Sequence, residues 1–394
     1  MKGFVFILFP LFLFASCSML VLDGGALSED TDNLLLVVDS ELESKVAPEL
    51  EQYREDLSAE GINTEVLYFT GEARDLRTEL QQYTEGLWSA FLIGNIPAAY
   101  FEQVIEEGYE QFPVDLYYSS PETKWTDEDG NSIYDEHTDI SITVPVSRIM
   151  GTPEEIQSYF RKNHRYRSGE LSYSDSALIF KDDDWSTYRQ GKDFGLSNLV
   201  ANVTLVENIS DTVKPEYVEA VSGEYRYVYQ WIHAVPYSLY IQEDDDYKAV
   251  TVLDVENGLI GSGFYNMFNC KGARFSEDNL GMTYLTDTDG GLAALGSTKI
   301  GGNFEPLEFH RSLSAGLSWG KAYMNWYNRT GAYDDAWYLG MVILGDPTLK
   351  VNAAAAESRG VKGGTALSEL VPPSDEEKAE HLQNLQRFDE MQQR

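Results

Sequence analysis

Cys270 and His233 are the two residues whose types and spacing point to covalent catalysis. Each ends an apolar, β-type run: residues 227–233 end on the histidine and residues 263–270 on the cysteine. A thiol attacks a carbonyl group as its thiolate, and a neighbouring imidazole supplies the base or the ion-pair partner. The pair therefore predicts acyl transfer if the two side chains meet. The alternative is a small buried cysteine and a structural histidine at a strand end.

Alternating strand and helix patterns surround the pair and predict the sheet that must position it. Such alternation indicates parallel βαβ units, and catalytic groups in open α/β sheets gather at the carboxyl ends of strands. The 37 residues from His233 to Cys270 leave room for a connection and a neighbouring parallel strand. We therefore expect a doubly wound, mostly parallel α/β fold in two subdomains, residues 34–169 and 170–352. The expected strands are 34–39, 64–69, 88–93, 140–146, 176–180, 203–207, 227–233, 263–270 and 291–296, and the expected helices are 40–60, 72–85, 152–166, 215–222, 277–287, 304–315 and 319–329.

Five short motifs occur in order between residues 88 and 351. They are Trp88-Ser-Ala-Phe-Leu-Ile-Gly-Asn-Ile-Pro97, Val114-Asp-Leu-Tyr-Tyr118, Val146-Ser-Arg-Ile-Met-Gly-Thr-Pro-Glu-Glu155, Leu292-Ala-Ala-Leu-Gly-Ser-Thr-Lys299 and Leu344-Gly-Asp-Pro-Thr-Leu349. With His233 and Cys270 between the third and the fourth, this stretch resembles the gingipain family, cysteine peptidases of the caspase-like clan.

The resemblance implies a caspase-like α/β fold and a cell-envelope cysteine endopeptidase that acts on proteins or peptides. Cys270 falls at the family's nucleophile and His233 at its base, so the thiolate would attack a peptide carbonyl and the histidine would protonate the leaving amine. The backbone N–H groups of Cys270 and of Ala234, where the family usually has glycine, would hold the oxyanion. Gly272 would let the chain turn sharply beside the nucleophile. No cofactor is required for this chemistry.

The departure at residues 234–236, Ala-Val-Pro, favours a rival interpretation. In it, the same fold serves as a catalytically inactive, gingipain-like surface lipoprotein that acts as a binding or structural module. A metal-dependent glycan hydrolase is a third interpretation, which rests only on the acidity and the aromatic content.

Two charged residues near these motifs have alternative roles. Lys271 either stabilises the Cys270 thiolate or faces solvent. Asp115 either orients His233, lines the substrate pocket or caps a loop.

Among the other histidines, His310 falls within an expected helix and is a poorer candidate for the base.

Residues 127–139 are rich in oxygen ligands and form a candidate site for a structural calcium ion. Asp127, Asp129 and Asp135 would be the ligands, and related peptidases use calcium structurally. The glycine of this segment is misplaced for an EF-hand. The alternative is an exposed acidic turn.

The N-terminus predicts export and lipid anchoring. Met1-Lys2 precedes an apolar run that is too short to span a bilayer comfortably, and residues 14–17, Phe-Ala-Ser-Cys, resemble the bacterial lipobox. We expect a signal peptide at residues 1–17, diacylation of Cys17 and a tether at 18–33. The protein would then be lipid-anchored at the bacterial cell envelope, on the outer membrane or cell surface, or otherwise secreted. Residues 353–394 are expected to form a flexible or helical tail.

Composition limits the partners. The chain has 394 residues, and 29 Lys+Arg against 65 Asp+Glu give a formal net charge of −36. Such acidity repels phosphate backbones, which excludes nucleic acid as a partner, and we expect membrane contact through the lipid anchor only. With only two cysteines, one predicted to be lipidated, we expect no disulfide framework.

Overall fold

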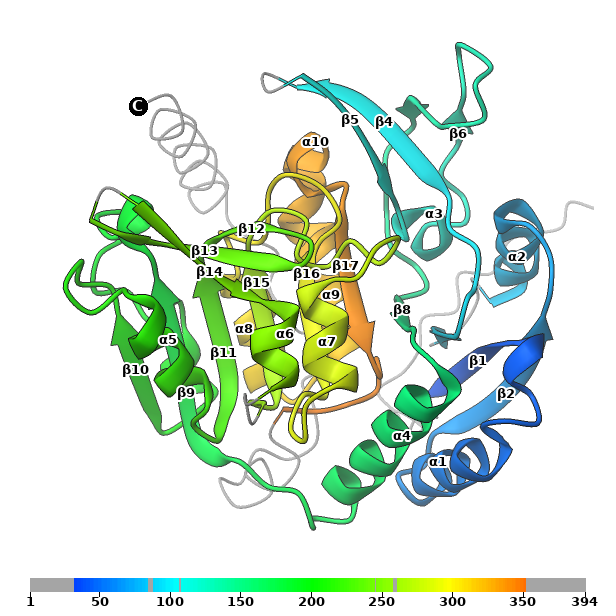
Figure 1. Cartoon of the computed structure of the whole chain (residues 1–394). Helices are drawn as coiled ribbons and strands as arrows, with labels where there is room; N and C mark the ends of the chain where they lie inside the picture. The colour runs from blue at the N-terminus through cyan, green and yellow to red at the C-terminus, as the bar shows by residue number, and fades with distance from the viewer. Residues whose placement is uncertain (1–31, 84–87, 106–107, 245, 258–260, 352–394) are drawn as a thin grey trace, which may run out of the picture. The chain divides into compact units, whose positions relative to one another are not determined.

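The alternating pattern folds into a ten-stranded sheet in the computed structural model, which describes residues 32–351 except 84–87, 106–107, 245 and 258–260 (Figure 1). Its strands are β1 (Asn33–Asp39), β2 (Asn63–Phe69), β3 (Trp88–Ile93), β8 (Val146–Ile149), β9 (Ser174–Lys181), β10 (Asn202–Val206), β11 (Tyr225–Trp231), β15 (Phe264–Phe268), β16 (Ala293–Ser297) and β17 (Met341–Gly345). The order across the sheet is β10-β9-β11-β15-β16-β17-β8-β3-β1-β2. Every neighbouring pair is parallel except β16 and β17, which are antiparallel. The expected mostly parallel α/β fold is thereby confirmed.

Helices cover both faces of the sheet, as a buried parallel sheet requires. They are α1 (Ala47–Ala59), α2 (Ala73–Leu80), α3 (Leu116–Ser119), α4 (Pro153–Arg167), α5 (Lys214–Val221), α6 (Val252–Glu256), α7 (Leu280–Thr286), α8 (Leu307–Ser314), α9 (Trp319–Arg329) and α10 (Asp335–Tyr338). Single turns of 3₁₀ helix lie at Ser40–Leu42, Gln81–Tyr83, Asp183–Trp185, Leu196–Asn198 and Gly331–Asp334. Figure 1 looks onto the face that α1, α4, α5, α6 and α7 cover.

Strand β1 shows how the two faces are built. Leu34, Leu36 and Val38 belong to the cluster that contains α1 and α4, whereas Leu35 and Val37 belong to the cluster that contains α8 and α9. Successive side chains of a strand point to opposite faces, so an uninterrupted apolar run buries both.

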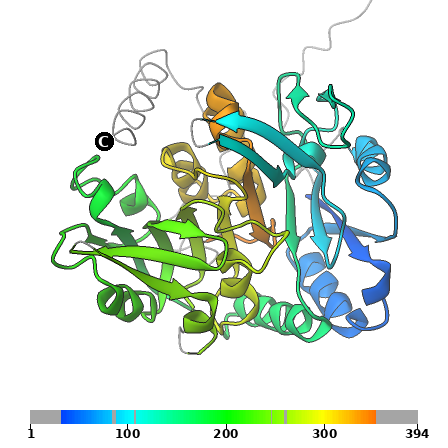
Figure 2. The same cartoon turned by 45° about the horizontal axis from the view of Figure 1, so that its top comes forward.

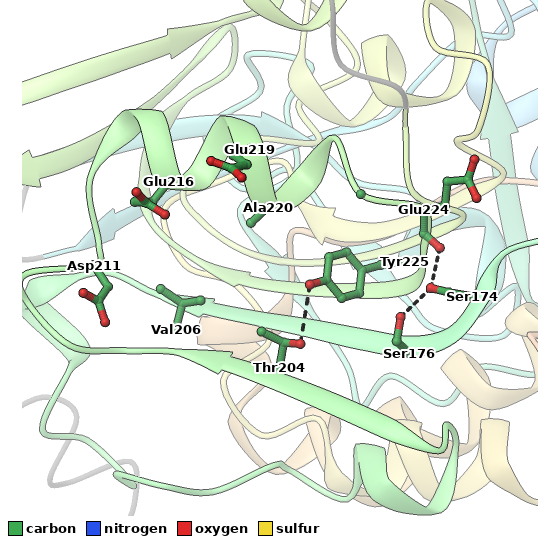
Figure 3. A pocket seen from close by; sticks show the side chains of 11 residues that line it. Ser174, Ser176, Thr204, Val206, Asp211, Glu216, Glu219, Ala220, Glu224 and Tyr225 are labelled. Atoms are coloured by element: carbon green, nitrogen blue, oxygen red, sulfur yellow. Dashed lines mark hydrogen bonds between the residues drawn. The ribbon is translucent and has the colours of Figure 1, made fainter.

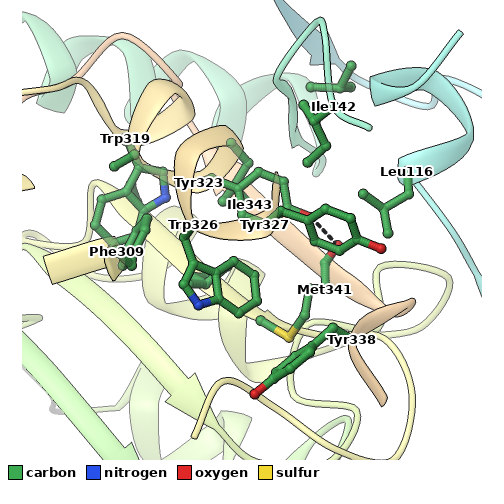
Figure 4. Packing of buried hydrophobic residues seen from close by; sticks show 14 of the residues in the cluster. Leu116, Ile142, Phe309, Trp319, Tyr323, Trp326, Tyr327, Tyr338, Met341 and Ile343 are labelled. Atoms are coloured by element: carbon green, nitrogen blue, oxygen red, sulfur yellow. Dashed lines mark hydrogen bonds between the residues drawn. The ribbon is translucent and has the colours of Figure 1, made fainter. Parts of the chain in front are cut away.

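The core on the far face is largely aromatic (Figure 4). Trp319, Tyr323 and Trp326 project from α9, and all are at most 1% exposed. Trp326 also donates its indole N–H to the Glu305 carbonyl at 2.8 Å, so its polar atom is satisfied inside the core. This helix matches the expected range 319–329, because its aromatic residues recur at helical spacing.

The two expected subdomains contribute to one sheet. Residues 34–169 supply β1, β2, β3 and β8, and residues 170–352 supply the other six strands. The two sets meet where β8 pairs with β17, with Ser147 opposite Ile343. Because β17 is parallel to β8 and antiparallel to β16, the change of strand direction lies between β16 and β17, within the second set.

Three small antiparallel units were not expected from the sequence. A hairpin of β4 (Tyr100–Ile105) and β5 (Gly108–Pro113) follows β3, and β6 (Trp125–Thr126) pairs with β7 (Glu136–His137). A three-stranded unit of β12 (His233–Val235), β13 (Ser238–Glu243) and β14 (Asp246–Thr251) follows β11. These strands carry many polar residues and lack the apolar runs of the main sheet.

The expected strand at 140–146 is wrong, and β8 begins only at Val146. Ile140, Ile142 and Val144 are buried, as their alternation indicated, but they form no β-ladder. Instead, the Asn328 side chain accepts a hydrogen bond from the Ile142 N–H at 2.8 Å and donates one to its carbonyl at 2.9 Å. The Asn328 side-chain amide thus makes the hydrogen bonds with Ile142 that a neighbouring strand would make in a β-ladder.

A buried ion pair joins the end of β17 to α4. Arg167 Nη2 lies 2.6 Å from Asp346 Oδ2, and Asp346 is fully buried. Asn163 donates to the same oxygen at 2.8 Å, and Thr348 donates twice to the other. Burial alone would raise the pKa of Asp346, but the Arg167 charge and the Thr348 bonds hold it below its ordinary value.

The described residues contain no helix both long and apolar enough to cross a membrane. The expected signal peptide at 1–17, all but the last residues of the tether at 18–33, and the tail at 353–394 lie outside the described residues.

Asp346→Asn should destabilise the fold by about 3–5 kcal/mol, because the buried Arg167 charge would lose its buried partner and keep only the more exposed Glu60. Urea unfolding at pH 7 measures this. The surface pair Arg161–Glu49, in which Arg161 is exposed and Glu49 half-buried, provides the control, and Glu49→Gln should cost less than about 1 kcal/mol. The Asp346 pKa is lowered, so its contribution is complete above the ordinary carboxyl pKa and is lost as the pH falls through the lowered value. Equal losses for both variants would contradict this assignment.

Candidate functional site

The register of β11 and β15 sets the positions of the predicted base and nucleophile. These strands pair in parallel, with Trp231 opposite Phe268. His233 and Cys270 each lie two residues beyond that pair, and the Ile232 N–H donates to the Phe268 carbonyl at 3.3 Å. The structure therefore places both residues at the carboxyl ends of adjacent strands, where the sequence predicted them.

His233 begins the small unit β12–β14 and rests against aromatic side chains. Its ring centroid lies 4.4 Å from that of Trp185 and 6.2 Å from that of Tyr247. Its Nε2 atom lies 2.8 Å from Asp184 Oδ2. A carboxylate on Nε2 fixes the imidazole orientation and leaves Nδ1 for another partner. The His233 side chain is 37% exposed, so solvent and ligands can reach it.

Asp184 is a site residue that sequence reasoning missed. It lies in an acidic turn, residues 182–184, directly after β9, and β9 is the neighbour of β11 in the sheet. Asp182 accepts a hydrogen bond from the Gln242 N–H at 3.0 Å, and burial raises the pKa of Asp182 to about 7. The available signal was three consecutive aspartates at the carboxyl end of a strand, which is the position where site residues gather.

Cys270 lies in the turn after β15 and is partly buried. Burial raises the pKa of its thiol, and the Glu110 carboxylate raises it further. The Gly301 backbone N–H, Lys299 and Lys271 act in the opposite direction. The resting thiol is therefore neutral at pH 7. Among the residues that the structure describes, no hydrogen bond joins it to His233.

The turn after Cys270 is sharp, but its unusual backbone lies at Lys271 and not at Gly272. Lys271 has φ +62°, a left-handed conformation that a side chain makes costly. Gly272 is required for a different reason, since a Cβ atom there would lie 2.1 Å from Asn269 Oδ1. The expectation that Gly272 provides the conformational freedom is corrected accordingly. The Lys271 ammonium lies 3.8 Å from Glu110 Oε1, and its side chain is 30% exposed.

Ala234 can occupy the family's glycine position without strain. Its φ is not positive, so the backbone there does not need glycine, and its N–H remains a candidate oxyanion donor. The following residues form a tight hairpin, in which Val235 pairs with Ser238 across a two-residue turn of Pro236 and Tyr237. This turn accounts for the departure from the family pattern at residues 234–236.

Asp115 does not orient His233. Both of its carboxylate oxygens accept hydrogen bonds from Arg148, at 2.5 and 2.7 Å, and both side chains are at most 3% exposed. The Arg148 guanidinium also stacks on the Phe275 ring, 3.8 Å from its centroid. Asp115 therefore positions Arg148 inside the protein, and the expected role as orienting residue belongs to Asp184.

The acidic segment forms a carboxylate cluster with a different membership from the one expected. Asp129 and Asp135 offer oxygens within 4.8 Å of one another and of Glu102. Asp127 instead accepts hydrogen bonds from the backbone N–H groups of residues 130–132, which lower its pKa. Glu102 lies on β4, and only the unexpected hairpin brings it to the segment.

His310 is a core residue, consistent with its lower rank as a base. Its Nδ1 lies 2.8 Å from the Phe194 carbonyl, and its Nε2 lies 2.9 Å from the Tyr227 hydroxyl. Burial lowers the pKa of His310 to about 4, so it is neutral and structural.

An open polar groove of about 660 Å³ lies between α5 and the edge strands of the sheet (Figure 3). The Tyr225 hydroxyl donates to Thr204 Oγ1 across it at 3.4 Å, and the Ser174 hydroxyl donates to the Glu224 carbonyl at 2.7 Å. Neither His233 nor Cys270 lines it. Asp211, Glu216, Glu219 and Glu224 make its lining acidic.

Gly272→Ala should destabilise the protein by about 1–3 kcal/mol, because the new methyl group would overlap the Asn269 side chain. Urea unfolding checks this. The double variant Asn269→Ala/Gly272→Ala should recover most of the loss, since it removes the clashing atoms. Additive losses in the double variant would show that the contact with Asn269 is not the reason for the glycine.

No protein-family model and no curated protein matches the sequence. The resemblance to gingipains therefore rests on the motifs alone.

Proposed function

We propose that the protein is a cysteine endopeptidase of the gingipain type, with Cys270 as nucleophile and His233 as base. The observation that carries this proposal is the matched register: both residues lie two positions beyond the Trp231–Phe268 pair of adjacent parallel strands. The Asp184 carboxylate on His233 adds the third group of a nucleophile, base and orienting residue.

The reaction begins with a neutral thiol. His233 Nδ1 takes the Cys270 proton as the sulfur forms a bond to the substrate carbonyl carbon, and Asp184 stabilises the imidazolium that results. The tetrahedral intermediate collapses when His233 returns this proton to the leaving amine, which breaks the C–N bond and leaves an acyl-enzyme. In the second half of the reaction, water loses a proton to His233 as its oxygen bonds to the acyl carbon. The C–S bond then breaks and His233 returns the proton to the sulfur, which releases the acid and restores the thiol.

Backbone N–H groups hold the negative oxygen of the intermediate in this proposal. The candidates are the N–H groups of Cys270 and Ala234, as the family resemblance implies. The Lys271 N–H is not available, because it donates to the Lys299 carbonyl at 2.9 Å.

The catalytically inactive binding module remains the second candidate. Two observations favour it: the pKa of the Cys270 thiol is raised by burial, and no hydrogen bond joins this thiol to His233 among the described residues. Catalytic hydrogen bonds are often long without substrate, so the missing hydrogen bond is also compatible with the peptidase proposal.

The envelope location belongs to the same proposal. Diacylation of Cys17 would anchor the protein at the bacterial surface, where protein or peptide substrates are present. Metabolic labelling of the expressed full chain with a fatty acid, compared with Cys17→Ala, tests the anchor independently of the peptidase chemistry.

The proposal predicts covalent labelling of the full chain by acyloxymethylketone probes that differ at the residue preceding the scissile bond. Cys270→Ala should abolish labelling. His233→Ala should lower peptide hydrolysis by about 10²–10⁴-fold with little change in Tm, because the ring is 37% exposed and makes one hydrogen bond.

Asp184→Asn is the matched test of the third group. It keeps the size and a hydrogen-bonding oxygen but removes the charge that stabilises the imidazolium, so we expect a loss of kcat smaller than that of His233→Ala. Absence of labelling and of hydrolysis in the folded wild-type protein would overturn the peptidase proposal in favour of the binding module.

We also propose a structural calcium ion at Glu102, Asp129 and Asp135. Three carboxylates within 4.8 Å of one another match the oxygen ligands that calcium prefers. Asn131 links two of them, since its Nδ2 donates to Glu102 at 2.9 Å and to Asp129 at 3.2 Å. The ion would hold the β4–β5 hairpin to residues 127–135 and would take no part in the reaction.

Calcium at a hundredfold excess over its Kd should stabilise the wild-type protein by about 2.7 kcal/mol. Thermal unfolding with calcium and with a chelator measures this. Glu102→Gln should lose most of the gain, whereas Glu136→Gln, a neighbour outside the cluster, should keep it. An identical response of both variants would contradict the assignment.

A further inference from the structure

The β4–β5 hairpin reaches the two segments that surround Cys270, although it precedes them by more than 150 residues (Figures 1 and 2). Arg274, just after the cysteine, donates to the Gln111 carbonyl at 2.6 Å. Thr298, in the loop after β16, donates to the Pro113 carbonyl at 2.7 Å. The hairpin therefore contacts both the turn after Cys270 and the loop after β16.

Glu110 of β5 is the ionisable residue at the centre of these contacts. It is 6% exposed, and its Oε1 accepts the Ile300 N–H at 2.8 Å and lies 3.8 Å from the Lys271 ammonium. Its other oxygen, Oε2, is buried and has no hydrogen-bond partner among the described residues. A buried carboxylate with an unpaired oxygen is costly, and the Lys271 ammonium is the charge that offsets part of this cost.

The loop that Glu110 holds lies directly against the thiol. The N–H of Lys271, the residue after the cysteine, donates to the Lys299 carbonyl of this loop at 2.9 Å, and the Gly301 N–H lowers the pKa of the thiol. Gly301 has φ +120°, and a Cβ atom at Gly302 would lie 2.9 Å from Phe268 Cα. The Lys299 ammonium, in the same loop, donates to the Ile300 carbonyl at 2.7 Å.

We propose that Glu110 is a positioning residue for Cys270: through Ile300 it fixes the loop that binds the turn after the thiol, and its carboxylate faces the ammonium of Lys271, the residue next to that thiol. Lys271 and Lys299 carry the opposing charges. The inference rests on the proposed function in taking Cys270 as the nucleophile, but its two physical effects exist whether or not the protein hydrolyses peptides.

The charges around the thiol give the expected signs. Glu110 raises the thiol pKa, whereas Lys299 and Lys271 lower it. The other charged neighbours are paired or turned to another partner: Arg274 with Glu277 at 2.9 Å, and His233 with Asp184. Removal of the Glu110 charge should therefore increase the thiolate fraction, and removal of the Lys271 charge should decrease it.

The test is the pH dependence of iodoacetamide alkylation in the full chain carrying Cys17→Ser, in which Cys270 is the only thiol. Glu110→Gln keeps an acceptor for Ile300 but removes the charge, so its alkylation profile should shift to lower pH, with about three- to tenfold faster alkylation at pH 7. Lys271→Gln should shift the profile the other way. Glu277→Gln, an exposed acid near the same turn, should leave it in place.

The positioning role has its own readout. Glu110→Ala removes the acceptor as well as the charge, so amide hydrogen exchange at Ile300 and Gly301 should become faster than in Glu110→Gln. An unshifted alkylation profile in Glu110→Gln, or equal exchange in the two Glu110 variants, would overturn the proposal. Absence of peptide hydrolysis in the wild type would contradict the proposed function, but it would not affect the alkylation and hydrogen-exchange measurements.

Discussion

Parallel pairing of β11 with β15 is the constraint on which the candidate site depends. Both strands are buried on both faces, and a slip of one residue would move every side chain of one strand to the opposite face. The register is therefore fixed by the packing of large residues such as Trp231 and Phe268, whose rings lie 4.4 Å apart between centroids. Because the chain leaves both strands at the same edge, this packing also determines where His233 and Cys270 emerge. The packing of Trp231 against Phe268 therefore fixes both the register of the core strands and the positions of the two site residues.

The motifs that carry the family resemblance serve mainly the fold. Asp115 and Arg148 form one buried ion pair, and Asp346 and Arg167 form another. A buried charge that loses its partner costs several kcal/mol, so such pairs tolerate little change once the surrounding fold relies on them. A sequence resemblance built on these residues therefore supports the architecture more directly than it supports catalysis. The chemistry has to be argued from His233, Cys270 and their neighbours.

The sequence predicted the main sheet well because its strands are continuous apolar runs, such as residues 34–39, and its helices have clear periodicity. It failed where side chains replace backbone partners: residues 140–146 alternate and are buried, but the Asn328 amide takes the place of a strand. It also missed Asp184 and offered Asp115 as one candidate for orienting His233, because proximity between His233 and Asp184 arises only from the order of β9 and β11 in the sheet. The hairpin that carries Glu102 and Glu110 left no strong pattern, since polar residues interrupt both of its strands.

The opposed charges around Cys270 bear on when the proton moves in the proposed reaction. Transfer before attack would place a thiolate beside the Glu110 carboxylate in a buried site, with only Lys271, Lys299 and one N–H group to offset it. Transfer during attack avoids this, because the negative charge then develops on the substrate oxygen while the imidazolium forms against Asp184. The geometry thus favours a thiol that ionises only as the bond to carbon forms. A resting thiol of this kind also resists adventitious alkylation and oxidation, which attack the thiolate.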